Sequence, residues 1–227
     1  ASYRFYGLTA GDILKQIAAD LQIPVSVIED TGYQIPSLLE DDQSCLDIIE
    51  EAIEQTLLNT GKIYVLYDDG NGLCLQEAAN MKSSTVLGDR SLVTDYTYKT
   101  DIDQQTYNSI KLARENEETG GADVVEVFDS QNIANWGLLR LYQTVDGDLN
   151  TAQMASQAET MLAYYNRRLR TLSVEALGVL GLRAGMMVFM KIKGLGDIDL
   201  DQYVLLEKVT HTFENDKHTM SFETLAI

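Results

Sequence analysis

Cysteine and basic residues are scarce in this chain, and each shortage excludes a class of protein. Cys45 and Cys74 are the only two cysteines, which is too few for a disulfide framework, and their surroundings favour buried free thiols. The 227 residues carry 17 lysines and arginines against 35 aspartates and glutamates, a formal net charge of −18. An acidic surface of this size repels phosphate groups, so we expect neither a nucleic-acid partner nor a membrane partner.

Long apolar runs are missing as well. No run reaches the roughly 18 residues that a membrane-spanning helix needs. The first residues, ASYRFYG, have neither the apolar core nor the cleavage pattern of a signal peptide. The sequence does not begin with methionine and enters patterned sequence at once, so we expect a further segment before residue 1.

The motifs of several common enzyme and cofactor sites are also absent. No Gly-x-Ser-x-Gly elbow occurs, and the glycines at 178, 181 and 185 have neither phosphate-loop nor dinucleotide-binding spacing. The acidic loop 194–201 is followed by Gln202 and Lys208 where a calcium-binding EF-hand would need Gly and Glu. We therefore expect no cofactor and assign no catalytic residue.

Residues 1–85 have the pattern of a small α/β domain. Thr9 and Ser44 each begin a capping-box pattern completed three residues later by Asp12 and Asp47, and an apolar stripe at helical spacing follows each one. Gly61 is placed to end the second helix. Two apolar segments, 62–67 and 73–76, flank the turn sequence DDGNG, which predicts a hairpin. These features predict two helices on a short sheet.

Residues 86–227 have mostly β composition, and polar residues at 80–85 and 88–89 mark the boundary before them. One long helix is predicted over residues 151–168. The predicted strands are 92–99, 108–114, 124–128, 171–177, 186–192, 203–213 and 217–225. The fold class is therefore α+β, with the second domain a barrel or sandwich that carries one long packed helix.

The only two histidines lie in the last hairpin, whose register can be predicted from the alternation of its apolar residues. A two-residue turn at Asn215-Asp216 pairs Phe213 with His218. The following residues then share one face: Val209, His211, Phe213, His218, Met220 and Phe222. On this register the two histidines are diagonal neighbours, with Cα atoms about 7–8 Å apart.

This face offers two nitrogen ligands, whereas zinc needs three or four. Glu214 points to the opposite face and Asp216 lies in the turn, so neither completes a metal site or an acid–base pair. His211 and His218 stay candidates for metal binding, but we favour half-buried packing or interface residues. Arg167, Arg168 and Arg170 lie at the end of the predicted long helix, where cations suit the helix dipole, and they are candidates for partner binding.

Several segments of the chain resemble phage tail hub proteins. SQNIANWGLL (130–139), which contains the only tryptophan, Trp136, resembles their "S-x-x-x-I-x-x-aromatic-G-x-L" segment. LRAGMMV (182–188) resembles an "L-R-A-G-x-x-V" strand entry, and the stretch from Tyr203 to Met220 resembles a closing "Y-x-V-x-x-V-x-H-x-F … H-T-M" hairpin. LTAGDIL (8–14) is similar to the helix–strand domain of the same group. The order of these segments is similar to the XkdQ/YqbQ-like tail proteins of PBSX-type prophages, which have a late control D-like hub fold.

The resemblance implies a trimeric ring in the baseplate of a contractile tail, prophage tail or tail-like bacteriocin, assembled in the bacterial cytoplasm. It implies contacts with the tail tube protein, the central spike and other baseplate proteins, and a β-domain before residue 1. Trp136, the three arginines and the two histidines are the candidate interface residues. We predict a structural protein and not an enzyme.

Two other classes stay open at this stage. The first alternative is a peptidoglycan hydrolase or metal-dependent hydrolase that uses His211 and His218. The second is a carbohydrate-binding module, for which Trp136 and scattered tyrosines offer little support.

Overall fold

The computed structural model describes residues 2–88, 91–102, 105–116, 120–145, 147, 149–196 and 198–225. It has the mixed α+β composition predicted from the sequence. The chain forms two compact units that are discontinuous in sequence. Unit 1 comprises Ala1–Glu77 and Gln105–Arg167, and unit 2 comprises Ala78–Gln104 and Arg168–Ile227. These units do not decide the predicted domain boundary at residue 85, which stays a prediction.

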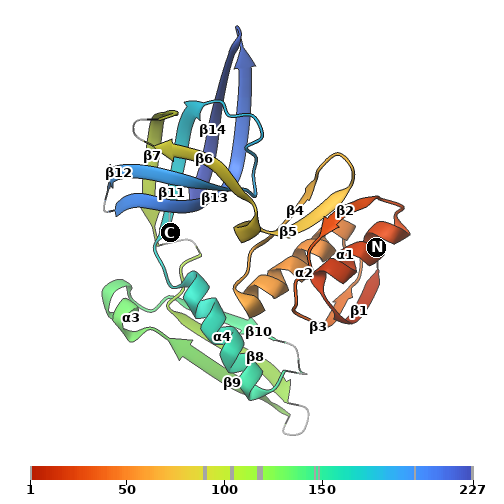
Figure 1. The fold of residues 1–227 in the computed structure, drawn as a ribbon. Coiled ribbons are helices and arrows are strands. Elements are labelled where there is room, and N and C mark those ends of the chain that lie inside the picture. The colour runs from red at the N-terminus through yellow and green to blue at the C-terminus, as the bar shows by residue number, and fades with distance from the viewer. Residues whose placement is uncertain are drawn as a thin grey trace. The chain divides into compact units, whose positions relative to one another are not determined.

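The first part of unit 1 has two helices and two small sheets (Figure 1). One sheet pairs β1 with β3, and the other has the order β2-β5-β4. Their apolar side chains and those of both helices form one core that includes Phe5, Ile13, Ile48 and Leu75. The elements are β1 (Tyr3–Leu8), α1 (Ala10–Asp20), β2 (Val25–Ile28), β3 (Ile35–Glu40), α2 (Cys45–Thr60), β4 (Tyr64–Asp68) and β5 (Leu73–Glu77).

Both helices begin where the capping patterns predict. Thr9 is the N-cap of α1, and its hydroxyl accepts a hydrogen bond from the Asp12 N–H at 3.2 Å. Ser44 and Asp47 form a complete capping box at α2, and Gly61 ends that helix at φ +71°. A residue with a Cβ would be strained at this φ, which is why glycine suits the position.

The second part of unit 1 is a three-stranded sheet of order β10-β8-β9 with α4 on one face (Figure 1). β8 and β9 are antiparallel, whereas β10 is parallel to β8. Ile110, Leu112, Met154 and Met161 are buried between sheet and helix, and Leu58 of α2 joins the same cluster. The elements are β8 (Ser109–Asn116), β9 (Gly121–Phe128), α3 (Ser130–Trp136), β10 (Arg140–Thr144) and α4 (Thr151–Tyr165).

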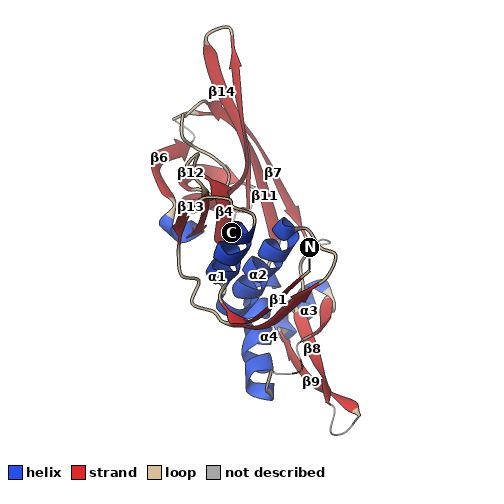
Figure 2. Ribbon diagram, turned by 90° about the vertical axis from the view of Figure 1, so that its right-hand side faces the viewer, coloured by secondary structure: helices blue, strands red, loops and turns tan. Residues whose placement is uncertain are grey.

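Unit 2 is built on one six-stranded sheet of order β6-β12-β13-β14-β11-β7. Its buried face forms a single apolar cluster that includes Leu172, Val188, Met220 and Phe222. The β13–β14 hairpin extends past the ends of the other strands of this sheet (Figures 1 and 2). The elements are η1 (Ala78–Asn80), β6 (Lys82–Gly88), β7 (Val93–Asp101), β11 (Leu169–Leu177), β12 (Met187–Leu195), β13 (Ile198–Glu214) and β14 (Lys217–Leu225).

Three features differ from the sequence-based expectation. The described strands form open sheets and none closes, so the barrel alternative is corrected: β6 pairs only with β12, and β7 only with β11. The polar stretch at 80–85 contributes to strand β6, which runs parallel to β12. The long helix ends at Tyr165, three residues before the predicted end, and it packs in unit 1.

No helix in the described part of the chain is long and apolar enough to cross a membrane.

Candidate functional site

The histidine hairpin has the register predicted from its apolar alternation. Phe213 pairs with His218, and His211 pairs with Met220 across β13 and β14. Both histidines are half-buried, while Met220 next to them is buried. The apolar face of the hairpin therefore runs from the core of unit 2 out to Phe213, which is 66% exposed.

The two imidazole rings are hydrogen-bonded directly to each other. His211 Nδ1 lies 2.9 Å from His218 Nε2, and His211 Nε2 lies 2.8 Å from the Leu182 carbonyl oxygen. A carbonyl only accepts, so His211 Nε2 carries a hydrogen and, in the neutral ring, His211 Nδ1 accepts from His218. One hydrogen atom, carried by His218 Nε2, therefore lies between the two rings.

The neighbouring turn fixes the position of His218. The Gly178 N–H donates to the His218 carbonyl oxygen at 2.9 Å, and a Cβ at Gly178 would lie 2.2 Å from atoms of the His218 ring. On the hairpin itself, the Phe213 ring stacks on His218 with centroids 4.2 Å apart and an interplanar angle of 13°. Glycine at 178 is thus required by packing against the imidazole.

This arrangement does not supply a metal centre by itself. Among the described residues, no three His, Cys, Asp or Glu side chains come together as metal ligands. His211 Nδ1 and His218 Nε2, the two ring nitrogens that face each other, are already hydrogen-bonded to one another and are not free to bind a metal. The geometry is that of a packed and mutually satisfied pair at a partly exposed hairpin. The assignment of these histidines to an interface stays a prediction.

The segment around Trp136 forms the short helix α3 and a partly buried polar network. Asp129 is the N-cap of α3, and the Asn166 side chain donates to its carboxylate at 2.8 Å. Hydrogen bonds from the Asn132 main chain and from Asn166 hold the pKa of Asp129 below its usual value. Asn108 donates to the Gly137 carbonyl at 2.7 Å and accepts from the Leu139 N–H at 2.8 Å. Trp136 is half-buried.

The three candidate arginines are divided between the two units. Arg167 ends unit 1, with its guanidinium 4.9 Å from the centre of the Tyr164 ring. Arg168 begins unit 2, and Arg170 lies on β11. Because α4 has already ended at Tyr165, these cations do not occupy its last turn. The helix-dipole role expected from the sequence is therefore corrected, while a role in partner binding stays a prediction.

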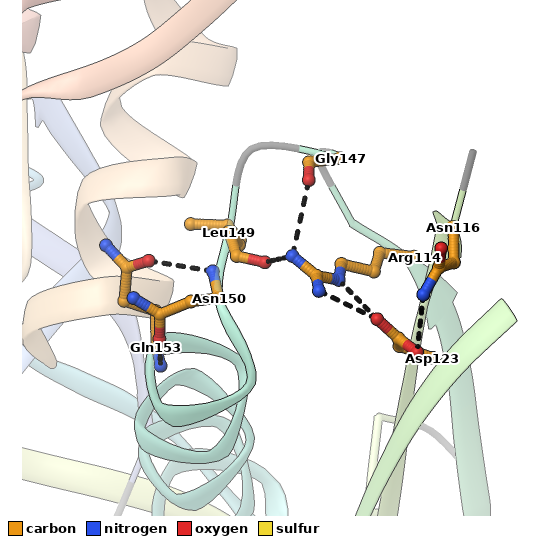
Figure 3. A network of polar contacts seen from close by, with 7 residues as sticks. All are labelled: Arg114, Asn116, Asp123, Gly147, Leu149, Asn150 and Gln153. Carbon is orange, nitrogen blue, oxygen red and sulfur yellow. Dashed lines mark hydrogen bonds and ion pairs between the residues drawn. The ribbon is translucent and has the colours of Figure 1, made fainter. Parts of the chain in front are cut away.

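A further network in unit 1 ties the sheet to the start of α4 (Figure 3). Arg114 on β8 donates to Asp123 Oδ2 on β9 from Nε and Nη2, at 3.0 and 2.7 Å, and also to the Leu149 carbonyl. The hydrogen bonds that Asp123 accepts from Arg114 and from Asn116 lower the pKa of its carboxyl group. Asn150, next to Leu149, caps α4. Sequence reasoning missed this network, because it joins residues that are far apart in the chain.

The fold is that of phage tail proteins. The structure is similar to the crystal structure of the tail protein from Neisseria meningitidis MC58, with a TM-score of 0.71, 15% identity, and coverage of 100% of this chain and 70% of that one. A sequence model of the YQBQ-like family matches residues 1–224, and the chain belongs to this family. The resemblance to XkdQ/YqbQ-like proteins is thereby confirmed.

Two curated relatives come from Bacillus subtilis strain 168. The chain is 30% identical over 225 residues to the uncharacterized protein YqbQ and 29% identical over 225 residues to the phage-like element PBSX protein XkdQ. Each alignment covers 98% of this chain and 67% of the relative, so the chain spans about two thirds of these proteins. Family, relatives and fold together indicate a structural protein of the phage tail or baseplate type.

Proposed function

We propose that this chain is part of the hub of a phage-tail-like particle, where the tail tube meets the central spike and baseplate. The observation that carries the proposal is the family match across residues 1–224, together with a tail-protein fold over the whole chain. In this role the strands and the exposed hairpin supply contact surface, and no residue of the chain acts as a catalyst. The particle is assembled in the bacterial cytoplasm.

The hub works as a trimer, with the tail tube protein and the spike as its partners. The net charge of −18 suits a component that repels nucleic acid. About a third of each relative lies outside the matched region, and we assign part of the ring contacts to a segment of that kind. We assign these contacts to the surfaces around Trp136, the three arginines and the histidine hairpin.

Sedimentation velocity of the full-length protein, alone and mixed with tube or spike protein, tests the proposal. We expect a species of three copies, at least when a partner is present. A protein that stays monomeric in every mixture would contradict the hub role.

A second experiment tests the hydrolase alternative. Purified protein is assayed on peptidoglycan beside a double variant, His211→Ala with His218→Ala, and its bound metal is measured by elemental analysis. We expect no cleavage by either protein and no stoichiometric metal. Cleavage that disappears in the double variant would replace the structural proposal with a hydrolase.

A further inference from the structure

The stretch from the end of α1 through most of β2 is exposed although it is rich in apolar residues. Every residue from 19 to 27 is exposed. Four of these residues are large and apolar, and their exposed fractions lie between 40% and 48%: Leu21, Ile23, Val25 and Val27. We call these four side chains the β2 patch. A group of exposed apolar side chains so close together is typical of a protein interaction surface.

The core of unit 1 does not account for the β2 patch. The last buried residues of α1 are Ile17 and Ala18, and the next side chain that packs against the core is Ile28. Because successive side chains of a strand point to opposite faces, Val27 projects away from the face on which Ile28 meets the core. No residue of the patch belongs to an apolar cluster of the described residues. Folding alone therefore does not explain why these positions are apolar.

The main chain of β2 is open on one side as well. β2 is an edge strand that pairs in parallel with β5, through Val25 with Leu73 and Ile28 with Leu75, and it has no second strand partner among the described residues. Edge strands are commonly protected by charged side chains, proline or a bulge. Here Pro24 precedes the strand and the register shifts within it, but its exposed side chains are valines. A partner segment can thus cover the patch and pair with a short stretch of main chain.

The charge around the patch decides which kind of partner fits. Residues 1–77 contain 14 acidic side chains and only 3 basic ones. Asp20 and Asp30 flank the exposed run, and Asp69 lies alongside β2, where the Ser26 hydroxyl donates to its carboxylate at 2.8 Å. All three carboxylates are exposed, and none forms an ion pair with a described residue. Such a surface attracts a basic partner and repels a second copy of this acidic chain.

We propose that the β2 patch is the docking site for a basic segment of a partner protein, with apolar residues in its middle and lysine or arginine at both ends. The apolar middle covers Val25 and Val27, and the cations at the ends lie near the carboxylates of Asp20, Asp30 and Asp69. Apolar contact supplies most of the affinity, and the charges select the partner and speed its association. The inference goes beyond the proposed function and does not depend on it, because it concerns only residues of unit 1.

The probe is an acetylated and amidated peptide, Lys-Arg-Val-Thr-Val-Thr-Val-Arg-Lys, titrated into the isotopically labelled protein and followed by NMR. We expect saturable shifts of the main-chain amides between residues 21 and 28. A peptide with the same charges and serine in place of each valine should bind at least tenfold more weakly, because it lacks the apolar middle. Equal binding of the serine peptide would overturn the proposal, since it would show general charge attraction only.

Two further observations test the choice of a basic partner. A peptide with the same apolar middle and glutamate in place of its four basic residues should give no saturable shifts, and binding as tight as that of the basic peptide would contradict the proposal. The protein alone should show no concentration-dependent shifts at β2. Shifts of that kind would show that a second copy covers the patch, and would overturn the choice of partner.

A pair of matched variants tests the position of the site. Val27→Thr keeps the shape of the side chain and should weaken binding of the basic peptide about fivefold, because it replaces an apolar methyl group with a hydroxyl. Val86→Thr is the control, because Val86 is 50% exposed and lies on β6, an edge strand of unit 2. This control should bind the peptide like wild type, and both variants should melt within about 2 °C of it. Equal weakening by both variants, or unchanged binding by Val27→Thr, would contradict the site.

Discussion

The two units bury polar groups very differently. Among the described residues, Thr31, Thr56, Thr106, Asn108, Ser109 and Gln157 are the buried polar side chains of unit 1, whereas unit 2 has only Thr224. Unit 2 has a single apolar cluster on one face of its sheet, and unit 1 has two separate clusters. Unit 1 therefore combines its apolar cores with buried hydrogen bonds such as those of Asn108 and Ser109, and unit 2 depends on apolar volume and strand register.

The largest effect is expected from a deletion in the core of unit 2. Phe222 on β14 is 2% exposed, and Phe222→Ala should lower the free energy of unfolding by about 3–5 kcal/mol through lost burial and a cavity. Urea unfolding followed by hydrogen exchange would locate the loss in unit 2. Ser221→Ala, on the exposed face of the same strand, is the control and should change stability by less than about 0.5 kcal/mol. A similar loss in the control would argue against a one-sided core.

The corresponding test in unit 1 removes hydrogen bonds and not volume. Asn108 is fully buried, donates to Gly137 and accepts from Leu139. Asn108→Ala should lower the free energy of unfolding by about 2–4 kcal/mol, because it leaves buried main-chain groups unpaired. Asn108→Asp places a buried carboxylate oxygen against the Gly137 carbonyl oxygen and should cost at least as much as alanine. Chemical denaturation of the three proteins measures this order, and a neutral alanine variant would remove the contrast between the units.

A smaller effect is expected at the histidine pair. Gly178→Ala should cost about 1–2 kcal/mol, because the new methyl group displaces the His218 ring from its hydrogen bond and from Phe213. In a His218→Ala background the same change should be nearly neutral, which a double-mutant cycle measures. An undiminished cost in that background would mean that the main chain at 178, and not the imidazole, sets the requirement for glycine.

The smallest effect concerns acid. The folded-state pKa values of Asp123 and Asp129 are lowered by hydrogen bonds to their charged forms. The stability that they contribute is present above the usual aspartate pKa of about 3.9, and it is lost as the pH falls through the lower folded values. Unit 1 should therefore lose stability below about pH 4, and Asp129→Asn should reduce that dependence. Thermal melts at a series of pH values check this sign, and an equal pH dependence in the variant would contradict it.

Local patterns predicted the parts of the fold that local physics determines. Ser44 and Asp47 are three residues apart, and the hairpin turn at Asn215-Asp216 fixes its own register, so both could be derived from neighbouring residues. The open sheet and the pairing of β6 with β12 could not, because they join segments about a hundred residues apart. The placement of α4 in unit 1 depends on similar long-range packing.

The candidate sites divide in the same way. Parity placed His211 and His218 on one face, but the direct bond between the rings depends on rotamers and on the carbonyl of Leu182, which no spacing rule specifies. Asn108, just before β8, and Arg114, on β8, bond to loops that lie 29 and 35 residues further along the chain.

Electron cryomicroscopy of purified tail particles that contain the full-length protein tests the hub proposal most directly. The account predicts three copies of this fold in a ring where the tail tube meets the spike. Absence of the chain from the particle, or a position elsewhere in it without threefold symmetry, would contradict the proposal.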